Sequence, residues 1–105
     1  MRIRFDQGTP EPLRHSLGSH DVSTAFELGW STLVNGELLA MAEAKFDAFV
    51  TTDRNLKYQQ NLAGRHLAIL VLPFANWPRL QQHLPAIASA IEHMKPGDFV
   101  ELALP

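Results

Sequence analysis

The sequence contains no cysteine, and this absence removes two classes of structure. Disulfide bonds and thiolate metal sites both require cysteine, so any metal centre must use oxygen or nitrogen ligands. A chain without cysteine is compatible with a reducing compartment, and we expect a cytoplasmic protein.

Long apolar runs are also missing. The most apolar stretch, residues 66–72, is far shorter than the roughly 20 residues that a membrane-spanning helix needs. The amino terminus does not resemble a signal peptide either. We therefore expect no membrane partner.

Positive charge is not in excess: the formal net charge is -2. No overall basic field attracts nucleic acid, so binding of RNA or DNA would need a local basic patch or a metal bridge. The sequence also lacks a glycine-rich phosphate loop, a histidine pair at metal-ligand spacing and a nucleophile–base pair. The 105 residues are 46% hydrophobic, which suits one compact domain over residues 1–105.

Short apolar segments alternate with helical patterns along the chain, which predicts an α/β fold with a mostly parallel sheet flanked by helices. We expect the strand order 2-1-3-4, with strand 5 at the far edge. The expected strands are residues 1–6, 20–25, 47–52, 66–72 and 99–104. The expected helical segments are residues 10–17, 26–30, 36–45, 54–61 and a long helix after residue 76.

Three residues should shape the ends of these helices. Thr9 and Asn76 are candidate N-caps for the first and the last helix. Pro85 lies within the apolar stripe of the last helix and should kink or divide it, because proline cannot donate the helical hydrogen bond. Phe74, Trp77 and that stripe are more apolar than a chain of this length readily buries, so we also expect a homodimer through this helix.

Two strands that are distant in sequence each end in an acid. Asp6 closes the first strand, and Asp53 follows the third after Thr51-Thr52. In the expected strand order these strands are neighbours, so their carboxyl ends meet at the edge where open α/β sheets bind ligands. Carboxylates at one crevice are ligands that Mg²⁺ or Mn²⁺ prefers, and Glu37 is the simplest third acid.

Each of these acids also has a structural interpretation. Asp53 could cap the helix that follows it, and Glu37 in a first helical turn is favoured by the helix dipole. Glu27 is a secondary candidate, which could equally lie at the surface. Asn35 and Asn55 could add neutral oxygens or orient a water. The other acids, Asp47 among them, are expected to be solvated charges, and Arg2 and Arg4 are expected at the sheet margin.

A basic, amide-rich and aromatic segment follows Asp53 directly. Arg54 and Lys57 could contact the phosphates of a nucleic-acid strand, and Tyr58 could stack on a base. The alternative is a polar helix on the surface with no binding role.

Four segments taken together carry a family resemblance. They are Ile3-Arg4-Phe5-Asp6-Gln7, Ala25-Phe26-Glu27-Leu28-Gly29-Trp30, Asn35-Gly36-Glu37-Leu38-Leu39 and Val50-Thr51-Thr52-Asp53-Arg54-Asn55-Leu56. They resemble a short PIN-like family, whose members are presumed toxin-type ribonucleases of bacterial toxin–antitoxin pairs. The resemblance covers about residues 1–72, and the Thr-x-Asp at a strand end is its most specific part.

The resemblance implies a PIN-like three-layer fold and a metal-dependent endoribonuclease. Asp6 and Asp53 match two of the family's acids, and Glu37 is the acid nearest to the third, whose position Asn35 occupies. Asn55 stands in place of a fourth acid. The implied cofactor is Mg²⁺ or Mn²⁺, the implied substrate is RNA, and the implied partner is a small antitoxin-like protein.

Two other functions fit parts of the sequence. The amides at Asn35 and Asn55 favour a PIN-like module with a depleted acidic site that acts by protein–protein binding. A receiver-type signalling domain would share the parallel sheet and an acid after the third strand. It would also need paired acids after the first strand, but Gln7 follows Asp6, and Lys95-Pro96 precedes the last strand instead of following it.

Overall fold

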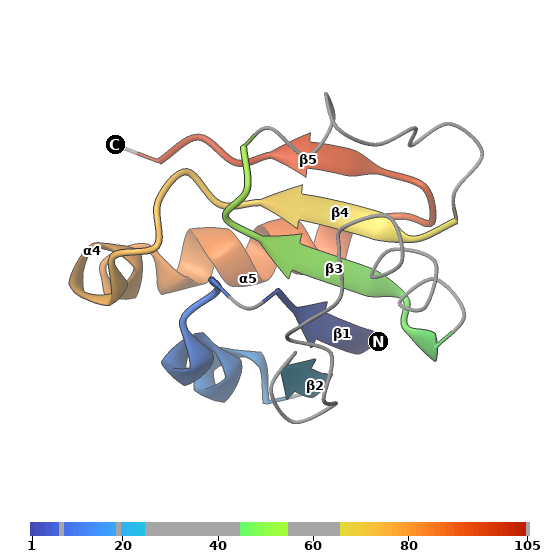
Figure 1. Cartoon of the computed structure of the whole chain (residues 1–105), viewed down its shortest axis with the longest axis horizontal. Coiled ribbons are helices and arrows are strands. Elements are labelled where there is room, and N and C mark those ends of the chain that lie inside the picture. Colours follow the sequence, from blue (N-terminus) through green and yellow to red (C-terminus); the bar gives the residue numbers. More distant parts are fainter. Residues whose placement is uncertain (7, 19, 25–44, 55–65, 105) are drawn as a thin grey trace.

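The structure is a computed structural model that describes residues 1–6, 8–18, 20–24, 45–54 and 66–104. These residues form a five-stranded sheet in the order β2-β1-β3-β4-β5, and every neighbouring pair is parallel (Figure 1). The predicted α/β class and strand order are confirmed. The strands are β1 (Arg2–Phe5), β2 (Asp21–Thr24), β3 (Ala48–Thr51), β4 (Ala68–Val71) and β5 (Phe99–Glu101).

The central strands are buried on both faces. Every residue of β3 and β4 is buried, whereas the edge strands β2 and β5 are partly exposed. Burial of every residue is typical of the central strands of a parallel sheet.

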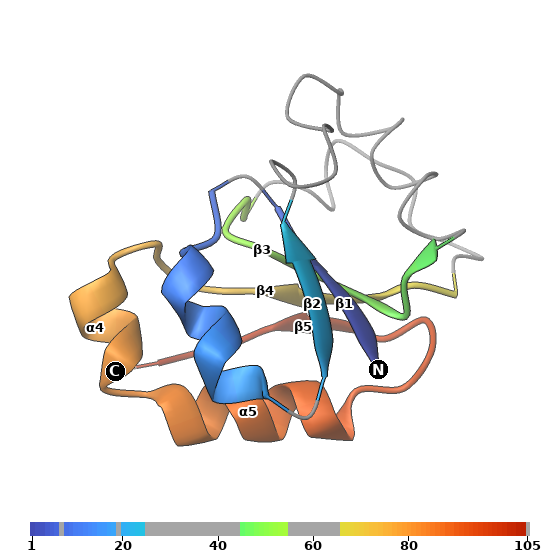
Figure 2. The same cartoon turned by 90° about the horizontal axis from the view of Figure 1, so that it is seen from below.

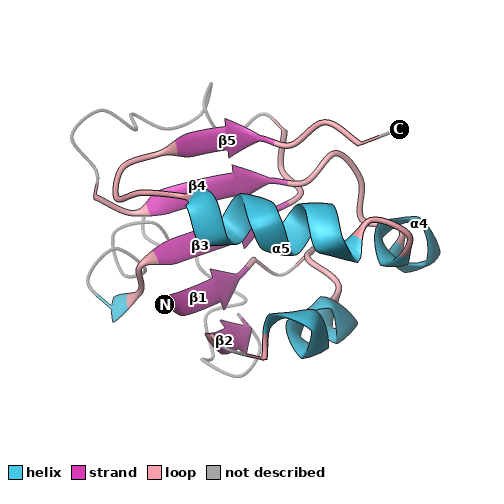
Figure 3. Ribbon diagram, turned by 180° about the vertical axis from the view of Figure 1, so that it is seen from behind, coloured by secondary structure: helices cyan, strands magenta, loops and turns pink. Residues whose placement is uncertain are grey.

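The three described helices lie on one face of the sheet (Figures 2 and 3). They are η1 (Glu11–Leu17), a 3₁₀ helix, and the α-helices α4 (Trp77–Gln81) and α5 (Leu84–His93). Their apolar side chains pack against the strand residues of that face and form the core. The fully buried members from the helices and strands include Ile3, Phe5, Leu13, Val50, Leu70, Leu80, Ile87 and Ile91.

The last helical region begins and divides as the sequence predicts. The side chain of Asn76 accepts a hydrogen bond from the backbone N–H of Arg79 at 3.1 Å and caps α4. A break at Gln82 and His83 separates α4 from α5, and Pro85 lies in the first turn of α5. Proline is tolerated there because the first N–H groups of a helix have no partner within it.

The expected N-cap at Thr9 is wrong. Thr9 is buried, and its hydroxyl donates to the carbonyl oxygen of Val50 at 3.0 Å instead of capping η1, whose N-cap position is taken by Pro10. The hydroxyl therefore ties the start of η1 to the end of β3.

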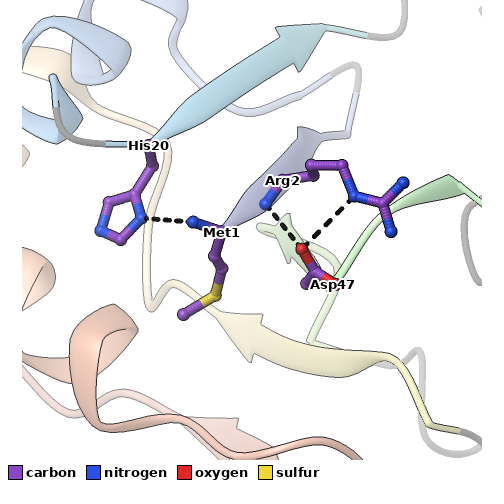
Figure 4. A network of polar contacts seen from close by, with 4 residues as sticks. All are labelled: Met1, Arg2, His20 and Asp47. Atoms are coloured by element: carbon purple, nitrogen blue, oxygen red, sulfur yellow. Dashed lines mark hydrogen bonds and ion pairs between the residues drawn. The ribbon is translucent and has the colours of Figure 1, made fainter.

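The amino ends of β1 and β3 are joined by a polar network (Figure 4). The backbone N–H of Arg2 donates to Oδ2 of Asp47 at 2.8 Å, and the N–H of Asp47 donates to the carbonyl of Arg2 at the same distance. The Arg2 side chain adds an ion pair, and the amino group of Met1 lies 3.2 Å from Nδ1 of His20. Asp47 is exposed, as expected of a solvated charge, but it also fixes the strand ends.

The described surface carries few large apolar side chains. Phe74 and Trp77, on which the expected homodimer depends, are half-buried and pack against the core. None of the helices within the described ranges has the length and apolarity needed to cross a membrane. The helical segments expected at residues 26–30, 36–45 and 54–61 lie wholly or largely outside the described residues.

Candidate functional site

The carboxyl ends of β1 and β3 lie side by side. The two strands pair in parallel with Phe5 opposite Val50, and the backbone N–H of Asp6 continues the pairing by donating to the carbonyl of Val50 at 2.9 Å. Asp6 therefore emerges next to Thr51, at the edge of the sheet where the strands end.

Thr51 connects the two candidate acids. Its hydroxyl donates to Oδ2 of Asp6 at 2.8 Å and accepts the backbone N–H of Asp53 at 3.0 Å. The Thr51 side chain is fully buried, whereas Asp6 and Asp53 are half-buried. One buried hydroxyl thus holds a carboxylate from β1 and orients the chain that carries the second carboxylate.

A close approach of the two strand ends also involves Gly8. A Cβ atom added at Gly8 would lie 3.0 Å from Oγ1 of Thr52, which is tighter than ordinary contacts. Glycine therefore lets the segment after β1 pass close to the segment after β3. A side chain at this position would press against Thr52, the residue between Thr51 and Asp53.

Arg4 also belongs to this region, contrary to the expectation from the sequence. We expected it at the sheet margin, but β1 is an interior strand and Arg4 is fully buried. Its Nη1 donates to the carbonyl of Phe5, and its guanidinium carbon lies 5.5 Å from the centre of the Phe49 ring. Alternation along β1 puts Arg4 and Asp6 on the same face of the sheet.

Burial and a nearby carboxylate act on Arg4 in opposite directions. Burial lowers the pKa of its guanidinium, and the attraction of the Asp6 carboxylate offsets part of that decrease. Because arginine starts from a very high pKa, it remains a cation. A permanent positive charge therefore lies beneath the candidate site.

The remaining predicted site residues divide into two groups. Arg54 is described and exposed, directly after Asp53. Among the residues that the structure describes, no group of three or more histidine, aspartate or glutamate side chains could hold a metal ion. The other candidates lie outside the described residues: Glu27, Asn35, Glu37, Asn55, Lys57 and Tyr58.

The two carboxylates suit a hard divalent cation. Mg²⁺ and Mn²⁺ prefer carboxylate oxygens, and Mg²⁺ commonly uses one or two carboxylates and keeps several waters. The Asp6 carboxylate lies at this sheet edge, and the backbone of Asp53 is held at the same edge by Thr51. The chemistry of the described donors therefore fits a magnesium or manganese site.

Comparisons with known proteins identify no relative of this chain. No family model matches the chain, and comparisons with curated proteins and with solved structures also give no match.

Proposed function

We propose that the protein is a metal-dependent endoribonuclease with a PIN-like fold over residues 1–105. The observation that supports this most strongly is the Thr51 hydroxyl, which joins Asp6 and Asp53 at the carboxyl ends of two neighbouring parallel strands. Open α/β sheets bind their ligands at this edge. The resemblance in segments 3–7, 25–30, 35–39 and 50–56 supplies the reaction class.

The proposed site has three acids. Asp6, Glu37 and Asp53 would hold Mg²⁺ or Mn²⁺, and a bound ion of this kind supplies charge neutralisation at a phosphodiester and a water of lowered pKa. Thr51 keeps the Asp6 carboxylate in a fixed orientation, so the site does not have to be ordered when the ion binds.

The proposed substrate is RNA, held next to the acids by the segment after Asp53. The exposed Arg54 carries a positive charge that can contact a phosphate. Lys57 could contribute a second phosphate contact, and Tyr58 could stack on a base. In the toxin–antitoxin setting that the resemblance implies, a small cytoplasmic antitoxin-like protein would bind and restrain this nuclease.

One observation favours a second function, a catalytically depleted PIN-like module that acts through a protein partner. Arg4 already supplies a buried positive charge beside Asp6. A resident cation reduces the need for a metal ion to balance the acid, and the amides at Asn35 and Asn55 point the same way.

The test is cleavage of a mixed RNA pool by purified protein, with Mn²⁺ and with EDTA. Asp6→Asn and Asp53→Asn should each lower the rate by about 100-fold or more, because even outer partners of metal ligands are worth about 10- to 100-fold. Asp21→Asn is the matched control: it removes an exposed acid at the start of β2 and should leave the rate unchanged.

Three results would contradict the nuclease. They are absence of cleavage by folded protein with Mn²⁺, cleavage that survives EDTA, and cleavage that survives both substitutions. Absence of both cleavage and Mn²⁺ binding would favour the binding module.

A further inference from the structure

Packing alone does not explain why a charged side chain occupies position 4. The side chain is fully buried in the interior strand β1 and lies over the Phe49 ring. A methionine or leucine would fill a similar volume without the cost of removing a charge from water. A buried charge at such a position needs a compensating group nearby.

The nearby carboxylate of Asp6 can compensate the charge of Arg4. Asp6 directly follows β1, two residues after Arg4 and on the same face of the sheet, so the Cα atoms of the two residues are about 7 Å apart. The Asp6 carboxylate attracts the guanidinium, and the Thr51 hydroxyl holds that carboxylate from the other side. The same carboxylate is a proposed ligand of the metal ion.

We propose that Arg4 is a built-in counter-charge of the acidic site, which keeps Asp6 compensated when no metal is bound and weakens the binding of a divalent cation. The inference rests on the proposed function in that it takes Asp6 as a metal ligand. Arg4 is a positioning residue, since it acts through Asp6 and is too buried to touch a substrate.

A counter-charge and a purely structural side chain make different predictions for two substitutions. Arg4→Lys keeps the charge and changes the shape of the head group, whereas Arg4→Met keeps an unbranched stem and removes the charge. A counter-charge makes the affinity for metal depend on the charge alone. A structural role would lower thermal stability in both variants and leave the affinity for metal unchanged.

The experiment is a calorimetric titration of the full chain with Mn²⁺. Arg4→Met should bind Mn²⁺ about five- to tenfold more tightly than the native protein, because a unit charge and a divalent ion separated by the roughly 7 Å spacing of two strand residues repel by about that factor even at the dielectric of water. Arg4→Lys should stay within about twofold of the native protein, because the charge remains.

Arg2→Met is the matched control. It removes the same charge from the same strand, but at the end that pairs with Asp47, so salt should screen it and the dissociation constant should change by less than about twofold. Circular dichroism melting verifies that each variant is folded. If Arg4→Met does not fold, Arg4→Gln, which keeps hydrogen-bond donors without the charge, should show the same tightening.

The four outcomes separate this inference from the proposed function. Tighter binding in the neutral variant than in the native protein supports the counter-charge. Native binding without tightening overturns the counter-charge and leaves the metal site intact. Binding by the neutral variant alone supports the counter-charge but contradicts a metal-dependent native enzyme. If neither protein binds Mn²⁺, both the counter-charge and the proposed metal site are overturned.

Discussion

The two ends of the β1–β3 strand pair use the same residue types in different surroundings. At the amino end, the side chains of Arg2 and Asp47 form an ion pair at 3.5 Å and are 57% and 50% exposed. At the carboxyl end, Arg4 is fully buried and Asp6 is half-buried. Burial, and not residue type, decides what each arginine and aspartate can do.

Exposure to water explains the difference between the two ends of the strand pair. An exposed ion pair is screened and contributes only about 0–1 kcal/mol, so the amino end can do little beyond aligning the two strands. Charges that are shielded from water interact more strongly. The carboxyl end therefore has the properties that a binding site needs.

Replacing Asp6 should have the strongest consequence for stability. Asp6→Asn should lower the free energy of unfolding by about 2 kcal/mol, because it removes the negative charge beside a buried cation. The measurement is urea unfolding in EDTA, so that no metal contributes. A variant as stable as the native protein, or more stable, would show that Arg4 does not depend on Asp6.

The next effect concerns the hydroxyl that joins the two acids. Thr51→Val keeps the shape but removes a donor to Asp6 and the acceptor for the Asp53 N–H, which should cost about 1–2 kcal/mol. Thr51→Ser retains the hydroxyl and is the control, with most of the loss recovered. Equal losses in the valine and serine variants, measured by urea unfolding, would assign the effect to packing instead.

The smallest effect belongs to the amino end. Asp47→Asn should cost less than about 1 kcal/mol at pH 7, because the side chain is exposed and its ion pair is screened. Urea unfolding measures this as well. A loss as large as that of Asp6→Asn would remove the distinction between the two ends.

The pH dependence of Asp47 has a defined sign. The hydrogen bond from the backbone N–H of Arg2, followed by the Arg2 side chain, holds the pKa of the carboxyl below its usual value. Its contribution is therefore complete above the unfolded pKa of about 3.9 and is lost as the pH falls through the lower folded value. Unfolding curves below about pH 4 should show this loss in the native protein and not in Asp47→Asn.

The sequence was sufficient to predict the strand order and the meeting of Asp6 with the Thr51–Asp53 segment. Both follow from alternating elements and from the geometry of parallel neighbours. The cap at Asn76 and the division near Pro85 were also predictable, because each depends on local chemistry alone.

The burial of Arg4 and the hydrogen bond of Thr9 were not predictable, because both depend on the tertiary structure. Alternation places Ile3 and Phe5 in the core and suggests that the side chains between them face water, but an interior parallel strand is buried on both faces. As an N-cap the Thr9 hydroxyl would accept a backbone N–H of the helix, whereas in the structure it donates to the carbonyl of Val50, whose position depends on the tertiary structure.

An amide NMR titration with Mn²⁺ tests directly whether the acidic site lies at the carboxyl ends of β1 and β3. The unpaired electrons of Mn²⁺ broaden signals close to the bound ion. We expect the signals of Asp6, Thr51 and Asp53 to broaden first, while those of Arg2 and Asp47 at the other end persist. Broadening centred on Asp47, or a uniform loss without a site, would contradict the assignment of the acidic site to the carboxyl ends of β1 and β3.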